Sequence, residues 1–111
     1  MSNIEEIQLD INEAREFVEQ GDRLVRLHKN EDFLHVIVDG YFKEEAARLV
    51  QLKASPAVQS EQMQRAITKS IDAIGELQQY FHKIYQMANN AEETIRQSEA
   101  ELEAMAEEGE I

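Results

Sequence analysis

The sequence contains no cysteine and no tryptophan, and it has a single proline among its 111 residues. Without cysteine the chain can form neither a disulfide framework nor a cysteine-ligated zinc site, and it fits a reducing compartment. Aromatic residues make up only 6% of the chain, and the 42% hydrophobic fraction is rich in Ala, Ile and Leu. This composition is typical of helices that meet along narrow apolar stripes.

Basic residues are also scarce, with 11 Lys and Arg against 23 Asp and Glu, which gives a formal net charge of −12. That charge makes direct binding to nucleic acid or to an anionic membrane surface unfavourable. No segment approaches the roughly 18 continuous apolar residues of a membrane-spanning helix, and the first residues lack the features of a signal peptide. We therefore expect a cytosolic protein that binds neither nucleic acid nor membrane.

The acidic residues are concentrated near the end of the chain, where six glutamates and no base follow Arg96. Negative charge at a helix C-terminus opposes the helix macrodipole, so we expect residues 107–111 to fray into an acidic tail. Such a tail acts either as a solubilising end or as a docking segment, and we favour the first role.

Two corners divide the sequence into three helical segments. Asn30 is a good helix N-cap because two acidic residues follow it, so a first helix should occupy 1–29. Pro56 disfavours helix at the preceding residue and can itself begin a helix. We therefore expect a long helix over 56–106, with Ser60 as an alternative N-cap.

The middle segment, 31–54, is helical in pattern but contains one glycine in its interior. Gly40 should divide it into helices over 31–38 and 41–53, although a single helix that tolerates the glycine is the alternative.

Apolar and small residues recur at alternating spacings of three and four in both outer helices, which is the pattern of a coiled-coil seam. The seam of the first helix comprises Ile4, Ile7, Ile11, Ala14, Val18, Gly21, Val25 and His28. The seam of the last helix comprises Ile67, Ser70, Ile74, Leu77, Phe81, Ile84, Ala88, Ala91, Ile95, Ser98, Leu102 and Met105. One register over so many residues predicts that this helix projects beyond a small globular core, since at ~1.5 Å per residue it would be roughly 75 Å long.

The width of each apolar stripe predicts how the helices pack. The first stripe widens towards its C-terminal end through Phe17 and Leu24, whereas the last is wide at its start and narrow beyond Ala91. A wide stripe implies several neighbours and a narrow one a single partner helix. Residues of the middle segment should therefore pack with 17–28 and 60–87 in a compact helical head, through Phe33, Val36, Ile37, Tyr41, Phe42, Ala46, Leu49, Val50 and Leu52.

These patterns predict an all-α fold: a helical hairpin with a long C-terminal helix, a compact head and an antiparallel coiled-coil stalk formed by the two ends of the chain. If His28 lies beside Phe81 or His82, Ala14 falls near Arg96 and Ile7 near Glu103. The same seams could instead pair between two chains in an intertwined dimer. Gly21 either permits close packing in the seam or marks a weak point. Gly40 and Gly75 are possible contact points between the middle segment and the long helix, with an exposed Gly75 as the alternative.

The residues offer little support for catalysis or for a metal. A di-iron carboxylate bundle needs two Glu-x-x-His pairs, and the nearest match is the single pair Asp32 and His35. His28 at a seam position is typical of a partly buried histidine and not of a metal ligand. No glycine-rich phosphate loop or nucleophile elbow is present. We expect a protein that is not an enzyme and has no cofactor.

The segments Asp32 to Val50 and Ile71 to Phe81 resemble a group of small, acidic, mostly uncharacterised proteins encoded by tailed bacteriophages, over about residues 15–105. The resemblance implies a viral protein used in particle building. The expected architecture is also similar to small phage scaffolding proteins, which often end in a basic capsid-binding segment, whereas this chain ends in acid.

Our leading hypothesis is a structural or assembly protein of a phage particle, either a scaffold or a minor virion component, in the host cytoplasm or the virion. The alternative is a phage-encoded inhibitor or DNA mimic that binds a basic host protein. A modest core predicts self-association, most simply as a dimer, or contact with phage structural proteins. The expected contact residues are Tyr41, Phe42, Ile84, Met87, Ile95 and Leu102.

Overall fold

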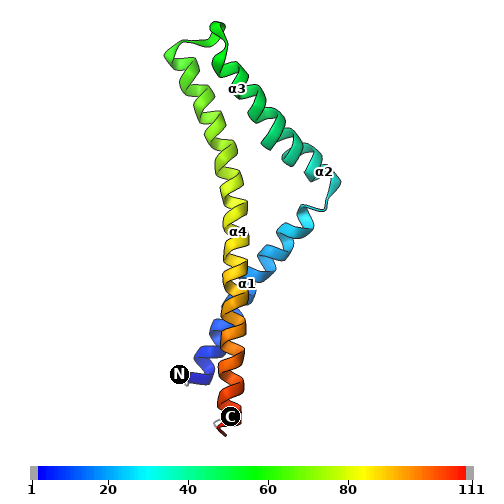
Figure 1. Ribbon diagram of the computed structural model, residues 1–111, viewed down its shortest axis with the longest axis vertical. Coiled ribbons are helices and arrows are strands. Elements are labelled where there is room, and N and C mark those ends of the chain that lie inside the picture. The colour runs from blue at the N-terminus through cyan, green and yellow to red at the C-terminus, as the bar shows by residue number, and fades with distance from the viewer. Residues whose placement is uncertain (1–2, 110–111) are drawn as a thin grey trace. The chain divides into compact units, whose positions relative to one another are not determined.

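The structure is a computed structural model that describes residues 3–109, and within that range it is all-α, with no strand. Its elements are α1 (Asn3–Leu27), α2 (Glu31–Phe33), the π-helical segment η1 (Leu34–Glu45), α3 (Ala46–Ala54), the 3₁₀ turn η2 (Pro56–Val58) and α4 (Glu61–Glu107) (Figure 1). The chain divides into two compact units: unit 1 contains Met1–Val25 and Lys83–Ile111, and unit 2 contains Arg26–His82. No described helix is both long enough and apolar enough to cross a membrane.

Unit 1 pairs α1 with the C-terminal part of α4 in an antiparallel arrangement. Gly21 lies against Ala88, whereas Ile11, earlier in α1, shares a groove with Leu102, later in α4. The expected seams are therefore confirmed, and in this structure they pair within one chain. The buried side chains of the unit are nearly all seam residues, namely Ile7, Ile11, Ala14, Leu24, Ala88 and Ala91.

The closest approach of the two helices of unit 1 is at Gly21. A Cβ atom built on Gly21 would lie 2.6 Å from the Cβ of Ala88, a separation that real Cβ atoms do not adopt. The neighbouring helix therefore leaves no room for a side chain at Gly21 without a shift, and of the two expectations for this residue close packing is correct. Ala14 and Ala91 also face each other across the interface and are buried, so small side chains set the separation of the helices.

Several details of the expected stalk differ from the structure. Val25 is exposed, and Leu24 takes the buried place at this end of α1. Phe17 belongs to unit 1 and stays exposed, although we expected it to pack in the head. The expected register of the two helices, by contrast, is confirmed by the contact of Gly21 with Ala88.

Unit 2 packs the middle segment against the first part of α4. Leu49, Ile67 and Ile74 form the buried core, and partly buried residues pack around them, namely Tyr41, Phe42, Ala46, Leu52, Val58 and Ile71. His28 lies 5.7 Å from Phe81 between ring centroids, as expected. Val36 and Val50, which we expected in this core, are wrong assignments, because both are exposed.

The middle segment is helical without a break from Glu31 to Ala54, so the expected division at Gly40 is wrong and the alternative of a single helix is correct. A π-helix forms i to i+5 hydrogen bonds and winds wider than an α-helix. This winding explains why Ile37 and Phe42 are half-buried while Val36 is exposed. A Cβ at Gly40 would lie 3.1 Å from the carbonyl oxygen of His35, five residues earlier, so its closest contact is within its own helix.

Capping side chains fix both corners of unit 2. Asn30 accepts a hydrogen bond from the backbone N–H of Phe33 at 2.9 Å, which confirms it as an N-cap. The hydroxyl of Ser60 accepts from the N–H of Met63 at 3.2 Å, so α4 begins after Ser60 and Pro56 starts only the short turn η2.

The end of α4 agrees closely with the expected boundary, since the helix stops at Glu107 and Gly109 follows with a φ of 79°. Part of the expected acidic tail, residues 110 and 111, lies outside the described residues. Gly75 has open space within 4 Å of its Cβ position, so the expected close contact with the middle segment at Gly75 is wrong, although the residue is half-buried and not fully exposed.

The two glycines Gly21 and Gly75 provide a matched pair of stability variants. Gly21→Ala should lower the free energy of unfolding by about 1 kcal/mol, because overpacking of about 1–3 kcal/mol outweighs a helix-propensity gain of about 1 kcal/mol. Gly75→Ala should raise it by about 0.5–1 kcal/mol, because nothing opposes the added methyl group. Urea denaturation followed by circular dichroism measures both.

The double variant Gly21→Ala with Ala88→Gly is the control for this prediction. Moving the methyl group to the other helix relieves the clash, so stability lost in the single variant should return in part. A Gly21→Ala variant as stable as Gly75→Ala would contradict the close approach.

Candidate protein-interaction surface

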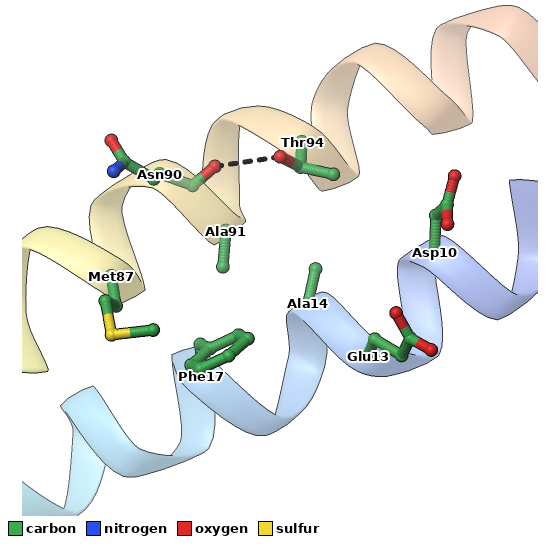
Figure 2. A pocket seen from close by; sticks show the side chains of 8 residues that line it. All are labelled: Asp10, Glu13, Ala14, Phe17, Met87, Asn90, Ala91 and Thr94. Atoms are coloured by element: carbon green, nitrogen blue, oxygen red, sulfur yellow. Dashed lines mark hydrogen bonds between the residues drawn. The ribbon is translucent and has the colours of Figure 1, made fainter.

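A groove runs along unit 1 between α1 and α4. It has a volume of about 320 Å³ and is lined by Asp10, Glu13, Ala14, Phe17, Met87, Asn90, Ala91 and Thr94 (Figure 2). Only two helices form its walls, so the groove is open to solvent along its length. A surface of this shape suits the side chains of a partner better than an enclosed small molecule.

Small residues of the seam form the floor of the groove. Ala14 and Ala91 are buried where the helices meet, and neither methyl group fills the space above the contact. The larger side chains Phe17 and Met87 lie on facing helices at one end of the groove, as Figure 2 shows. Phe17 remains 43% exposed although Met87 lies beside it on the facing helix.

Two of the four polar residues that line the groove are acidic, and none is basic. Asp10 and Glu13 extend the groove along α1 from Phe17, and neither carboxylate forms a hydrogen bond or an ion pair with any described residue. The hydroxyl of Thr94 donates to the backbone carbonyl of Asn90 at 3.1 Å and is therefore already satisfied. The two carboxylates are left as the groups that a partner would meet.

The two units differ greatly in charge. Unit 1 contains 15 acidic and four basic residues, a net charge of −11, whereas unit 2 contains eight acidic and seven basic residues, a net charge of −1. Nearly all of the charge of the chain therefore belongs to unit 1. A cationic partner would be attracted to unit 1 and would find no comparable field on unit 2.

Few of these acids are neutralised locally. Arg96 forms an ion pair with Glu93 one turn away, and this contact lowers the pKa of the Glu93 carboxyl and raises the pKa of the Arg96 guanidinium. The pair is fully exposed and lies within one helix, so it does little to hold the two helices of unit 1 together.

A second groove lies on unit 1, with a volume of about 310 Å³. Its lining is Gln8, Ile11, Asn12, Arg15, Glu99 and Leu102. Arg15 and Glu99 bring opposite charges to this groove, so it has no acidic bias. Leu102 is the one large apolar residue here that is only half-buried.

Unit 2 carries an aromatic cluster around Phe81. The Phe81 ring centroid lies 5.9 Å from that of Phe42 and 6.0 Å from that of Phe33, and Tyr41 lies 6.0 Å from Phe42. Such ring pairs stabilise a core, and Tyr41 and Phe42 also pack against the buried residues of the unit. Both are half-buried, so each presents only part of its surface to a partner.

The six contact residues expected from the sequence do not form one patch. Tyr41 and Phe42 belong to unit 2, while Ile84, Met87, Ile95 and Leu102 belong to unit 1, where Met87 and Leu102 line separate grooves. Ile84 and Ile95 are half-buried seam residues.

Sequence reasoning missed Asp10, Glu13 and Phe17 as members of a contact surface. A signal for them exists, because their spacings of three and four residues place all three on one helix face. Prediction of the surface also requires the size of the seam residues that oppose that face. Alanines there leave an aromatic neighbour uncovered.

Among the described residues, no three His, Cys, Asp or Glu side chains gather as a metal site requires. Compared with family models, curated proteins and solved structures, the chain matches none of them.

The charge of unit 1 predicts a salt dependence that unit 2 should not share. Raising NaCl from about 10 mM to about 200 mM shortens the Debye length from roughly 30 Å to under 10 Å and screens repulsion between the acids of α1 and α4. Hydrogen exchange should show protection rising in residues 3–25 and 83–107. Unit 2 is the internal control, and equal gains in both units would contradict the prediction.

Proposed function

We propose that the protein is a non-catalytic structural or assembly protein of a bacteriophage particle, a scaffold or a minor virion component, and that it acts through helix–helix contacts. The observation that carries the contact function is the open groove of unit 1, where Phe17 stays exposed beside unpaired carboxylates. The phage setting is supported by the resemblance of Asp32 to Val50 and Ile71 to Phe81 to small phage proteins.

Self-association belongs to the same proposal and is assigned to unit 2. Two copies of unit 1, each at −11, repel each other, whereas two copies of unit 2, each at −1, do not. Unit 2 also exposes large apolar side chains that its own core leaves uncovered, namely Val36, Val50, Met63 and Tyr80. Burial of such residues between two copies would supplement a small core.

A second candidate function is an acidic inhibitor or DNA mimic that occupies a basic site on a host protein. The charge of unit 1 favours it, because a field of this sign resembles that of a phosphate backbone. It requires no place in the particle, and this difference separates the two candidates.

Mass spectrometry of proheads and virions, purified from cells infected with a phage that encodes the chain, tests the leading proposal. We expect the protein in at least one particle form at a fixed ratio to the capsid protein. Absence from both forms, together with a stable complex with one basic host protein, would support the inhibitor instead.

Native mass spectrometry over a concentration series tests self-association. We expect a dimer whose population rises with concentration and falls in the variant Val50→Glu, because a carboxylate would replace an exposed apolar contact. Gln51→Glu adds the same charge at the neighbouring exposed position and is the matched control. A chain that stays monomeric at all concentrations would contradict this part of the proposal.

A further inference from the structure

We infer that the groove of unit 1 binds one basic amphipathic helix supplied by a different protein. This inference rests on the contact function proposed above, and it does not depend on the phage setting. It names the occupant of a surface whose own residues leave an aromatic ring and two carboxylates without partners.

The shape of the groove selects a helix. Two parallel walls separated by the alanine floor form a shallow trough, and the lining from Asp10 to Phe17 extends along about two turns of α1. An amphipathic helix can lie in such a trough and insert apolar side chains at i and i+3 or i+4, which forms a three-helix arrangement. Its apolar stripe would cover Phe17 and Met87, which lie together at one end.

The charge of the groove determines which residues should flank the apolar stripe of that helix. Glu13 and Asp10 lie about one and two turns from Phe17, respectively, on the same face, so Lys or Arg placed one or two turns from the apolar contact would meet them. The lining contains no basic residue that would compete for these carboxylates. An acidic or neutral helix would leave both without a counter-charge in a partly desolvated contact, which is unfavourable.

A second copy of the chain is a poor occupant. Another unit 1 would bring a charge of −11 against an equal charge. Several bases of unit 2 are already paired within their own helices, as Lys43 with Asp39, Arg48 with Glu45 and Arg65 with Glu61 show. Lys53 donates to the hydroxyl of Thr68 at 2.8 Å. The charge complementarity that the groove requires is therefore better supplied by another protein.

Binding of a synthetic peptide to the full chain tests the inference. The probe is a helical peptide of about 18 residues, or about 27 Å, with leucines on one face and lysines flanking them. Two comparison peptides carry glutamate in place of lysine, or the same residues in scrambled order. Fluorescence anisotropy at near-physiological salt should show saturable binding of the basic amphipathic peptide alone.

Matched variants of α1 locate the site. Phe17→Ala should weaken binding about tenfold or more, as truncation of a central aromatic contact does, and Leu9→Ala should change it less than about twofold. Leu9 is equally exposed on the same helix but does not line the groove. All substituted residues are exposed, so circular dichroism should show unchanged folding.

The electrostatic part of the inference is tested with two double variants that have the same net charge. Asp10→Asn with Glu13→Gln should weaken binding several-fold more than Glu16→Gln with Glu19→Gln, although each pair removes two charges from α1. Equal losses in the two pairs would mean general attraction to unit 1 and would overturn the inference, as would equal binding of the glutamate or scrambled peptide.

Binding of a second copy of the chain in the groove can be detected from self-association alone, without any peptide. If Phe17→Ala abolished self-association of the chain, the groove would be a homodimer interface and the inference would be wrong. Failure of peptide binding in a protein that is present in particles would overturn this inference and leave the proposed function standing. The two experiments therefore fail independently.

Discussion

The close contact of α1 with α4 at Gly21 and Ala88 determines most of what is distinctive about unit 1. Where two backbones approach this closely, side chains at the contact must be small, and small side chains bury little apolar area. The interface is therefore tight but energetically modest. It also leaves larger neighbours such as Phe17 and Met87 above the contact, where only a further element can cover them. The candidate interaction surface is thus a direct consequence of how the helices pack.

The charge of unit 1 opposes the association of α1 and α4 that their close packing favours. A net charge of −11 on two paired helices opposes their association, and the small seam offers limited compensation. A basic partner would relieve both conditions at once, because it neutralises acids and covers exposed apolar surface. Unit 2, at −1 and with a buried core of Leu49, Ile67 and Ile74, has exposed apolar side chains to cover but no comparable charge to neutralise.

The sequence predicted the fold best where periodicity is long and regular, and one of its errors in the middle segment lies where the local winding changes. The seams of α1 and α4 extend over many turns, so a single wrong residue, such as Val25, does not disturb the register. In η1 the wider π-helical winding displaces the buried face, and a 3.6-residue pattern then selects Val36 in error. Gly40 gave a second false signal, because it stays inside the helix. Its lack of a Cβ accommodates the His35 carbonyl there.

The candidate site was harder to predict than the fold, because it depends on the lack of large side chains at the seam positions beside Phe17. A sequence pattern marks residues that are apolar, and it assigns a flanking aromatic such as Phe17 to a core by default. Whether that residue is covered depends on the size of the side chains opposite it. Alanine at 14 and 91 permits close packing, and the same alanines cannot shield a ring beside them. An exposed aromatic next to a small-residue seam is therefore a better sequence indicator of a helix-binding groove than apolar content alone, because the feature that draws the helices together also prevents them from covering it.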